Sequence, residues 1–330
     1  MIVRAFEVVE ASQVAQARRA VKEAAARLGC DESACGRAAL VATELATNLI
    51  KHASGGELLL GVYDDDGGTG LQLIALDRGP GIADVGGAMR DGYSTAGGAG
   101  GGLGAVRRLS QFMEIASWPG QGTVVLARLA LSASVAREPG RANWACISIA
   151  KPGEEVCGDS ADVADASVGR TVLVVDGLGH GPAAAAVSAE AIRLFRRRQA
   201  APVTEILHNL HAGLRSTRGA AVAVARFEPA RVLFGGIGNI AGALVAPDGV
   251  RRMVSLNGTA GHVAARIHIF EYPYSGEMVL LHTDGLSSRW SFDRYPGLTA
   301  SHPALIAAVL CRDHWRRQDD VTVLVSRGAP

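Results

Sequence analysis

Glycine clusters that follow apolar, strand-like segments are the feature that most limits how this chain can fold. The chain has 41 glycines, and many of them fall at residues 79–81, 86–87, 97–104 and 177–181. Each cluster comes after a segment that is typical of a β-strand, and loops in that position commonly carry binding residues. The glycines therefore predict ligand-binding loops on a rigid scaffold rather than a flexible low-complexity chain.

Length and composition narrow the class of protein. At 330 residues, the chain is about twice the usual single-domain size, which favours two domains. Apolar residues make up 48% and charged residues 20%, which excludes a wholly disordered or fibrous chain. The net charge of +1 provides no overall field that would favour nucleic acid or an acidic membrane as a partner.

Targeting and redox features indicate a cytoplasmic location. No apolar run approaches the ~20 residues that a membrane span needs. Residues 1–7 alternate like a strand and lack the apolar segment of a signal peptide. The five cysteines are odd in number, scattered and not arranged in zinc-type pairs, which indicates reduced thiols.

The hydrophobic pattern predicts a first domain over residues 1–130. Asp31 is expected to cap the second of its helices. The predicted strands are 2–9, 57–63 and 70–77 with a closing hairpin at 114–130, and the predicted helices are 12–28, 32–52 and 103–113.

Residues 131–141 show no sustained pattern and are predicted to be a linker, and a second domain follows over 142–330. We see no internal repeat between the halves. The predicted strands of the second domain are 142–150, 170–176, 219–228, 231–237, 241–246, 265–272, 277–283 and 320–327, and its predicted helices are 181–198, 203–216 and 302–314.

Glu44 and Asn48 stand four residues apart on an otherwise apolar helix, so their side chains share one face. An amide oxygen together with nucleotide phosphates could complete the shell of Mg²⁺, which prefers oxygen ligands. The carboxylate could then orient or deprotonate an attacking hydroxyl. The pair also fits a hydrogen-bonded polar patch without chemistry.

Asp77 ends the apolar strand at 71–76 and is followed by Gly79 and Gly81. A carboxylate at a strand end can accept a hydrogen bond from an exocyclic amine, and the glycines let a flat base approach the backbone. The run at 97–104 then leads into a helix, whose free N–H groups form a phosphate cradle. It is not a Walker loop, because no Gly-Lys-Ser/Thr follows.

These three elements, in this order, resemble the N box and the two glycine boxes of the GHKL ATPase family. The resemblance covers about residues 1–130 and is closer still to the small RsbT-like and anti-sigma-factor serine/threonine kinases. It includes residues 91–95 before the lid and 120–123 in the last hairpin. Histidine kinases share these boxes, but no histidine precedes Glu44 to accept a phosphate.

The resemblance implies an ATP and Mg²⁺ site. Glu44 would be the catalytic base and Asn48 would hold Mg²⁺. Asp77 would read adenine with support from Thr123. The cofactor-binding residues that it implies are Asn48, Asp77, Gly79, Gly81, Ile82, Gly100, Gly102, Leu103, Gly104 and Thr123.

Aspartates also lie at strand ends in the second half. Asp176, Asp284 and Asp319 each adjoin a predicted strand, and Asp159 precedes one. A single Asp-Gly is usually only a turn. Several converging carboxylates, however, would repel one another unless cations neutralised them. Oxygen ligands of this kind suit Mg²⁺ or Mn²⁺ rather than zinc, and two such ions can activate a water for attack on phosphorus.

Across about residues 142–327 the chain resembles the PPM protein phosphatases of the SpoIIE and RsbX-like branch. The resemblance implies two Mn²⁺ or Mg²⁺ ions, with Asp176 as the bridging catalytic ligand. The implied metal ligands are Asp159, Asp176, the carbonyl of Gly177, Asp284 and Asp319.

Three further assignments follow from this resemblance. The family pattern favours Asp319 over Asp320 as the ligand, with Asp320 supporting it. His180 is expected to have a structural role rather than a role in proton transfer. The segment 235–239 is expected to serve backbone packing.

The predicted fold is therefore α+β in two domains, a GHKL (Bergerat) α/β sandwich followed by a PPM-type αββα sandwich. The resemblances imply a cytoplasmic bacterial partner-switching regulator. Its first domain would phosphorylate, and its second would dephosphorylate, a serine or threonine of a STAS-domain antagonist or stressosome scaffold. A phosphate adds about two negative charges, which suffices to switch an interface.

Two alternatives stay open. The first domain could bind ATP and a sigma-factor regulator without kinase activity and steer the phosphatase. It could also be catalytically silent. Glu44 favours catalysis, because nucleotide binding alone does not need that carboxylate. The resemblance leaves homodimerisation open, and no nucleic acid or membrane partner is expected.

Overall fold

The computed structural model describes two compact units. The N-terminal unit consists of Val3–Ala142 with Phe292–Arg312, and the C-terminal unit consists of Met1–Ile2, Asn143–Ser291 and Asp313–Pro330. The structure describes residues 2–65, 68–89, 102–130, 142–167, 169–246 and 249–328. The linker predicted at 131–141 lies outside these described residues.

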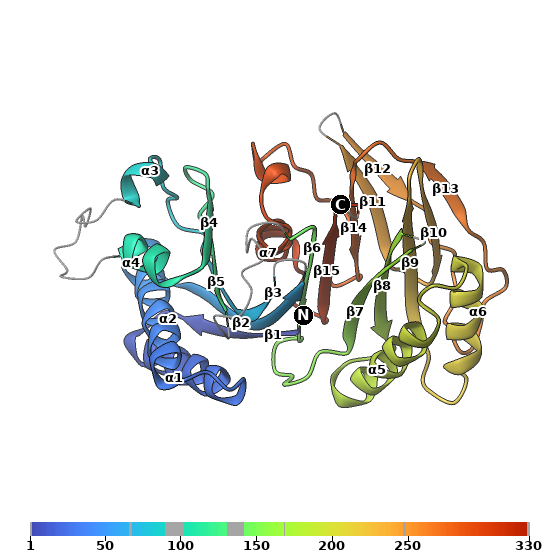
Figure 1. Cartoon of the computed structure of the whole chain (residues 1–330), viewed down its shortest axis with the longest axis horizontal. Helices are drawn as coiled ribbons and strands as arrows, with labels where there is room; N and C mark the ends of the chain where they lie inside the picture. Colours follow the sequence, from blue (N-terminus) through green and yellow to red (C-terminus); the bar gives the residue numbers. More distant parts are fainter. Residues whose placement is uncertain are drawn as a thin grey trace. The chain divides into compact units, whose positions relative to one another are not determined.

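The N-terminal unit is built on an antiparallel sheet in the order β1-β2-β3-β5-β4. Helices α1 and α2 cover one face of this sheet (Figure 1). The strands are β1 (Ile2–Val8), β2 (Gly56–Asp65), β3 (Gly68–Leu76), β4 (Phe112–Ser117) and β5 (Thr123–Ala130), and the helices are α1 (Ala11–Arg27), α2 (Glu32–Ala53), α3 (Val85–Ala88) and α4 (Gly102–Leu109).

Local sequence explains the long helix α2. Asp31 caps its start, because Oδ1 of Asp31 accepts a hydrogen bond from the N–H of Ala34 at 2.6 Å. One side of the helix is apolar and buried, including Val41, Leu45 and Leu49. This buried side packs into the core beneath the sheet, so the other residues of the helix are held in fixed positions.

The helix predicted at 103–113 is shorter in the structure. Helix α4 ends at Leu109, and β4 begins at Phe112. Residues of β4 pair with β5, from Phe112 opposite Arg128 to Ser117 opposite Thr123. Residues 112 and 113 were predicted as helix from the apolar periodicity alone. In the structure they belong to β4 because they pair with β5.

The segment Phe292–Arg312 belongs to the N-terminal unit by its contacts, although it is distant in sequence. It contains the short helix η1 (Leu298–Ala300) and most of α7 (Pro303–His314). The N–H of His302 donates to Oε2 of Glu114 at 2.9 Å. The rings of Trp118 and Tyr295 meet edge to face at 5.1 Å. These contacts join the segment to β4 and to the turn that follows it.

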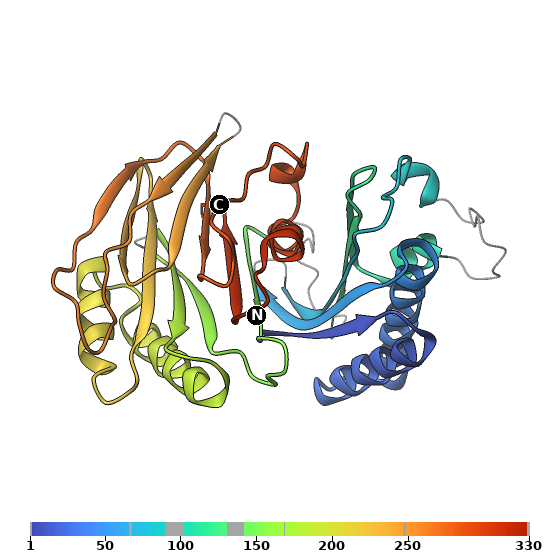
Figure 2. The same cartoon turned by 180° about the vertical axis from the view of Figure 1, so that it is seen from behind.

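The C-terminal unit contains two antiparallel sheets, in the orders β13-β10-β9-β8-β7 and β12-β11-β14-β15-β6. Figure 2 shows them from behind. The strands are β6 (Trp144–Ile149), β7 (Asp159–Ala166), β8 (Gly169–Gly177), β9 (Ala220–Glu228), β10 (Arg231–Ile237), β11 (Ala241–Ala246), β12 (Gly249–Met253), β13 (Phe270–Pro273), β14 (Met278–His282) and β15 (Val321–Ser326), and the helices are α5 (Gly181–Arg198) and α6 (Val203–Gly213).

Two hydrophobic clusters hold this unit together. One lies between the sheets and includes Val174, Phe234 and Leu281. The other packs α5 and α6 on the outer face of the first sheet, through residues such as Phe195 and Leu210. The arrangement of helices over stacked sheets confirms the α+β class for this half, and the helix-on-sheet arrangement confirms it for the other.

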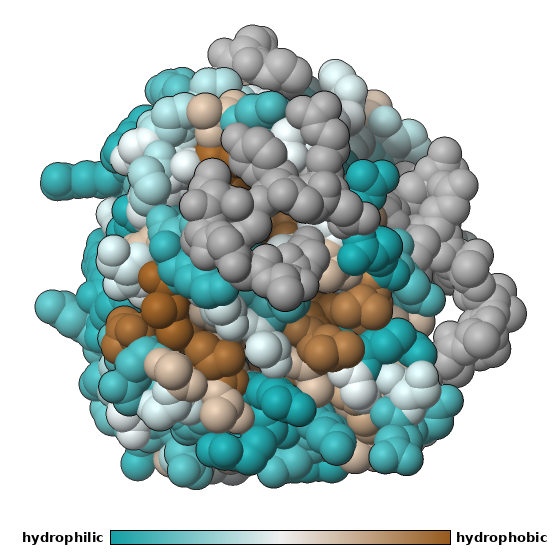
Figure 3. Space-filling model, turned by 90° about the vertical axis from the view of Figure 1, so that its left-hand side faces the viewer, coloured by the Kyte–Doolittle hydropathy of each residue, from teal (hydrophilic) through white to brown (hydrophobic). Residues whose placement is uncertain are grey.

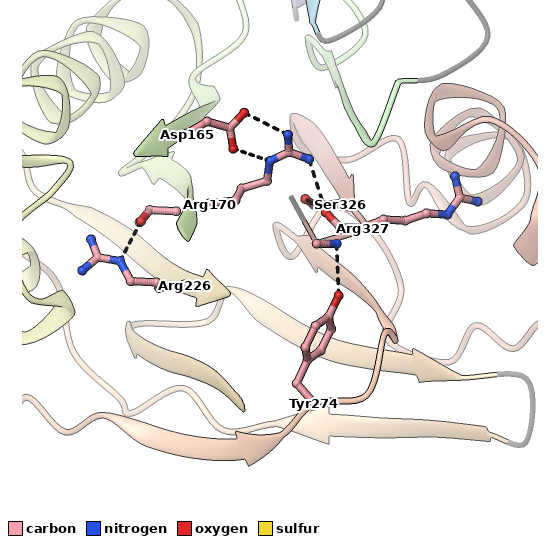
Figure 4. A network of polar contacts seen from close by, with 8 residues as sticks. Asp165, Arg170, Arg226, Tyr274, Ser326 and Arg327 are labelled. Carbon is pink, nitrogen blue, oxygen red and sulfur yellow. Dashed lines mark hydrogen bonds and ion pairs between the residues drawn. The ribbon is translucent and has the colours of Figure 1, made fainter. Parts of the chain in front are cut away.

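Buried arginines add polar contacts to this unit (Figure 4). Arg170 is fully buried, and its guanidinium makes two hydrogen bonds to Asp165, at 2.7 and 2.9 Å. It also donates to the carbonyl of Arg327 at 3.3 Å. The N–H of Gly328 donates to the hydroxyl of Tyr274 at 3.2 Å. Because a buried charge without a partner is costly, Arg170 fixes the position of the chain beyond β15.

The surface of the side that carries α1, α2 and α4 is mostly hydrophilic, with separate apolar areas (Figure 3). Exposed apolar side chains of this unit include Leu40 in α2 at 53% and Leu28, which follows α1, at 36%. None of the helices in the described ranges has the length and apolar character that crossing a membrane requires.

Candidate functional site

A cavity of about 510 Å³ lies in the N-terminal unit, and we call it the nucleotide cavity. Residues of α2, the end of β3, the start of α4 and β5 line it. It brings together eight of the residues expected at an ATP site, although they are spread over 80 positions of sequence. These are Glu44, Asn48, Asp77, Gly81, Ile82, Gly102, Leu103 and Thr123.

Glu44 and Asn48 reach the cavity from the same face of α2, as their spacing predicted. Lys51 and His52, in the last turn of the helix, line the same cavity. One helix thus contributes a carboxylate, an amide and a basic side chain to the lining of the nucleotide cavity. Such a set can bind phosphate oxygens and a hard cation while leaving a carboxylate for proton transfer.

Asp77 sits where β3 ends and is held by the backbone. Its Oδ1 accepts hydrogen bonds from the N–H of Gly79 at 2.8 Å and of Thr123 at 3.1 Å. Burial raises the pKa of Asp77, and these two hydrogen bonds together with nearby Arg312 act in the opposite direction. None of the described residues donates to Oδ2, so this oxygen can accept a hydrogen bond from a ligand amine.

Gly81 permits the close approach of two loops at the cavity. Its φ is +73°, and a Cβ at this position would lie 2.3 Å from the carbonyl oxygen of Trp118. No L-residue side chain fits this contact without moving the backbone. The loop after Asp77 is therefore packed tightly against the turn between β4 and β5.

Two further expected residues, Gly79 and Gly104, do not line the cavity. Gly79 contributes its N–H to Asp77 but does not line the cavity. Gly104 is buried within α4. Gly100 and the motif at 91–95 fall outside the described residues.

Sequence reasoning missed Ser117 and Arg312. Ser117 Oγ accepts a hydrogen bond from the N–H of Ile82 at 2.7 Å and lies 2.9 Å from Oγ1 of Thr123. Arg312 Nη1 donates to the carbonyl of Asp77 at 3.0 Å. Both residues support the loop that carries Asp77, but neither belongs to a local motif.

A second pocket of about 310 Å³ lies in the C-terminal unit, and we call it the carboxylate pocket. Three expected metal ligands line it, contributed by the ends of β8 and β14 and by the residues before β15. The pocket is lined by Asp176, Asp284 and Asp319, with Leu178, Gly179, Ala221, Gly238, Asn239, Asn257, Gly258 and Thr259.

The register of β7 and β8 places Asp159 directly opposite Asp176. Asp159 is only 3% exposed and is not part of the pocket lining. Its Oδ2 accepts a hydrogen bond from Oγ1 of Thr283 at 2.7 Å, and Thr283 Oγ1 in turn accepts from the N–H of Thr322 at 2.9 Å. Asp159 thus lies beneath the pocket and is oriented by a hydroxyl that sequence reasoning missed.

The carboxylates repel one another. Burial, together with the neighbouring carboxyl groups of Asp284, Asp319 and Asp320, raises the pKa of Asp176 to about 8. Burial and the neighbouring Asp176 also raise the pKa of Asp159. Carboxyl groups in this state are stabilised in their ionised form by nearby cations. The pocket therefore has the electrostatic character of a cation site.

Asp319 and Asp320 have different surroundings. Asp320 is buried, and its two oxygens accept hydrogen bonds from the N–H groups of Lys151 and Gly158, both at 2.7 Å. Asp319 lines the carboxylate pocket. Asp320 therefore ties the loop before Asp159 to β15, whereas Asp319 is available to a ligand.

Asn239 positions the carboxylate of Asp284. Its Nδ2 donates to Oδ2 of Asp284 at 2.6 Å. The segment 235–239 was expected to serve packing alone, but Gly238 and Asn239 line the pocket beyond the end of β10. The only sequence signal was the polar residue that ends this glycine-rich turn.

Gly177 and His180 follow Asp176 in the chain. Gly177 is buried, and a Cβ there would lie 2.3 Å from the carbonyl oxygen of Ala184, so only glycine allows α5 to approach this closely. His180 Nδ1 lies 2.6 Å from Oε1 of Glu154. Neither residue lines the pocket.

The donor set fits divalent ions that prefer oxygen. Within the described ranges, no three His, Cys, Asp or Glu side chains stand close enough together to form a complete metal cage. Mg²⁺ typically binds through one or two carboxylates and keeps several waters. The carboxylates here lie around a shared pocket and raise one another's pKa. Such an arrangement suits partly hydrated ions of this kind better than a closed cage of ligands would.

Comparison with known proteins matches residues 8–129 to the histidine kinase-like ATPase domain. Over 114 residues the chain is 37% identical to the serine/threonine-protein kinase RsbT of Bacillus subtilis (strain 168). This alignment spans 34% of this chain and 86% of RsbT. All the described residues of the expected ATP site fall inside the matched range.

Solved structures also resemble this chain. One comes from a study of the bacterial stressosome as a modular system adapted to control secondary messenger signalling; it is 26% identical, with a TM-score of 0.52, and covers 56% of this chain and 98% of its own. The structure of RsbX in complex with magnesium is 22% identical, with a TM-score of 0.48, and covers 56% of this chain and 94% of its own.

Proposed function

Through residues 8–129 the chain belongs to the histidine kinase-like ATPase family, and we propose that it is a partner-switching regulator with two opposed activities. The N-terminal unit phosphorylates a serine or threonine of a STAS-domain antagonist or stressosome scaffold, and the C-terminal unit removes that phosphate. The 37% identity to the kinase RsbT and the likeness to a stressosome structure support this proposal.

The observation that carries the kinase arm is the presence of Glu44 in the same cavity as Asp77 and Asn48. Asp77 Oδ2 accepts a hydrogen bond from the adenine amine, and Thr123 supports it. Asn48 would hold Mg²⁺ together with phosphate oxygens. The N–H groups at the start of α4 face the phosphates.

Glu44 acts on the protein substrate. Its carboxylate takes the proton of the attacking serine or threonine hydroxyl as the new oxygen–phosphorus bond forms. The bond between the γ-phosphorus and the bridging oxygen breaks at the same time, and ADP leaves. Nucleotide binding alone would not need this carboxylate, so Glu44 favours transfer over sequestration.

The phosphatase arm rests on the carboxylate pocket. Asp176, the carbonyl of Gly177, Asp284 and Asp319 would hold two Mn²⁺ or Mg²⁺ ions, with Asp159 as a further ligand or an anchor of their water shell. When bound, such ions lower the pKa of water and neutralise a phosphoryl group. Asn239 keeps Asp284 in position through its hydrogen bond of 2.6 Å.

In this proposal the protein acts on its partners in the cytoplasm. The decisive experiment is transfer of γ-³²P from ATP to a candidate STAS-domain protein, with wild type compared with Glu44→Gln. We expect wild type to label the partner, and Glu44→Gln to bind ATP with unchanged affinity but to label at a rate lower by about two orders of magnitude or more.

Glu32→Gln is the matched control, because Glu32 is exposed at the start of the same helix and lies outside the cavity. It should label like wild type. ATP binding without any transfer by wild type would refute the kinase arm and favour a nucleotide-sensing binder that steers the phosphatase.

A further inference from the structure

A turn at residues 217–219 lies at the edge of the carboxylate pocket. The carbonyl of Gly219 accepts a hydrogen bond from the N–H of Leu178 at 3.0 Å. A Cβ placed on Gly179 would lie 3.5 Å from Nη1 of Arg218. Leu178 and Gly179 both line the pocket. The guanidinium of Arg218 therefore lies beside the pocket wall, next to the loop that follows Asp176.

The turn is held by its own hydrogen bonds and by a neighbouring loop. Oγ1 of Thr217 donates to the carbonyl of Leu214 at 2.7 Å and accepts from the N–H of Gly219 at 3.0 Å. Nε2 of His262 lies 3.1 Å from the carbonyl of Thr217. Because both sides of the turn are tied down, the backbone that presents Arg218 has a defined position.

Charge distinguishes Arg218 from its surroundings. The lining of the pocket contains three carboxylates and, in the described part of the chain, no basic side chain. Burial and Asp319 raise the pKa of Asp284, and Arg316, on that side of the pocket, acts in the opposite direction. Arg218 is exposed, and within the described ranges no carboxylate pairs with it. Its guanidinium is thus available to an anion that enters the pocket.

A phosphorylated residue carries about two negative charges and would approach a pocket walled by carboxylates. A guanidinium binds phosphate through two parallel hydrogen bonds, which an ammonium cannot reproduce. We propose that Arg218 binds the phosphoryl oxygens of the substrate at the mouth of the carboxylate pocket. This inference rests on the proposed phosphatase function, and it adds a phosphate-binding cation to the carboxylates of the pocket.

The test compares Arg218→Ala, Arg218→Lys and wild type loaded with Mn²⁺, using p-nitrophenyl phosphate as substrate. We expect KM to rise about tenfold or more in Arg218→Ala, the size expected for a lost charge-assisted hydrogen bond. We expect kcat to change less than about threefold, because Arg218 touches bound phosphate rather than the attacking water. Arg218→Lys should fall between the two.

Direct binding separates this role from catalysis. Titration calorimetry with inorganic phosphate should show weaker binding to Arg218→Ala by a factor similar to the change in KM. Arg215→Ala is the matched control, since Arg215 is exposed three residues earlier and the pocket lining does not include it. It should leave KM and phosphate binding unchanged.

The outcomes distinguish the two claims. If wild type releases phosphate with Mn²⁺ and Arg218→Ala matches Arg215→Ala in KM and phosphate affinity, the role of Arg218 is refuted and the phosphatase function stands. If wild type and Arg215→Ala both fail to release phosphate with Mn²⁺, the phosphatase function is refuted and this inference falls with it.

Discussion

Asp77 and Asp176 both follow buried strands, yet their carboxyl groups have opposite surroundings. Asp77 accepts two backbone hydrogen bonds, from Gly79 and Thr123. Asp176 faces other carboxylates, among them Asp284, and its pKa rises to about 8 through burial and this repulsion. The same local pattern, an aspartate at a strand end, thus yields a hydrogen-bonded acceptor in one unit and, in the other, a carboxyl group whose ionised form is disfavoured.

The difference predicts how each site depends on its ligand. Backbone hydrogen bonds hold the Asp77 carboxylate in place without ATP, so the nucleotide cavity is preorganised. The carboxylates of the other pocket become fully stable as anions only when cations neutralise them. The second site should therefore depend on metal ions for both its structure and its activity, and the following variants test this contrast.

The largest effect is expected for Asp176→Asn. Removing the central carboxylate should lower Mn²⁺-dependent release of phosphate from p-nitrophenyl phosphate by more than about a hundredfold, because changes even to residues that only support metal ligands cost 10–100-fold. ATP binding should be unchanged. Steady-state phosphatase assays and calorimetric ATP titration measure the two effects.

Asp162→Asn is the control for this variant. Asp162 lies on β7 and pairs with the exposed Arg196, so its loss should change little. Phosphatase activity that survives in Asp176→Asn at the level of Asp162→Asn would refute the metal assignment.

The reciprocal variant, Asp77→Asn, should act only on the nucleotide cavity. Asparagine can still accept the two backbone hydrogen bonds through its oxygen, but it replaces the free Oδ2 by an NH2 group, which cannot accept a hydrogen bond from the adenine amine that we propose Asp77 binds. A lost hydrogen bond to a charged group costs about 1.5–3 kcal/mol, so ATP affinity should fall about 10- to 100-fold. Phosphatase activity should be unchanged.

Asp64→Asn serves as the control, because Asp64 is exposed on β2 and outside the cavity. Calorimetric titration with ATP compares the three proteins. If the Asp77→Asn protein binds ATP as tightly as Asp64→Asn, the proposed role of Asp77 in adenine recognition is contradicted.

A smaller effect is expected for Asn239→Ala. This change removes the donor that holds Asp284 at 2.6 Å and should lower the apparent Mn²⁺ affinity about tenfold. Activity measured as a function of Mn²⁺ concentration provides the comparison. Asn257→Ala is the control, since Asn257 lines the same pocket and makes no hydrogen bond to a carboxylate among the described residues. Equal Mn²⁺ curves for both variants would contradict the role of Asn239.

Local patterns predicted where many strands and helices lie, although α4 ends at Leu109 rather than at 113 and β13 covers Phe270–Pro273 rather than 265–272. The cap at Asp31 is confirmed at 2.6 Å, and the four-residue spacing of Glu44 and Asn48 brings both to the nucleotide cavity. These features depend on residues close in sequence, so periodicity and capping rules suffice. Strands β7 and β12 were missed, because β7 is rich in Asp and Ala and β12 is mostly exposed.

Residues that support a site from a distance could not be predicted in this way. Thr283 reaches Asp159 across 124 positions of sequence, and His302 reaches Glu114 across 188. Each contact depends on strand register and on the packing of separate elements, which no local motif encodes. A single serine or threonine also resembles the many serines and threonines on a protein surface, so its presence in the sequence does not indicate a supporting role.

The smallest effect, and the most specific test of preorganisation, is expected for Ser117→Ala. The change leaves the N–H of Ile82 without its acceptor and removes the partner of Thr123. It should lower the free energy of unfolding by about 1–2 kcal/mol and should weaken ATP binding by a smaller factor than Asp77→Asn.

Ser110→Ala is a close control, because the Ser110 hydroxyl is buried in the same unit without a hydrogen-bond partner among the described residues. Its removal should be nearly neutral. Thermal unfolding with and without ATP compares the variants. If Ser117→Ala unfolds like Ser110→Ala and binds ATP like wild type, the Ser117 hydroxyl does not preorganise the nucleotide cavity. The loop after Asp77 is then held by other contacts, such as that of Arg312 with the Asp77 carbonyl.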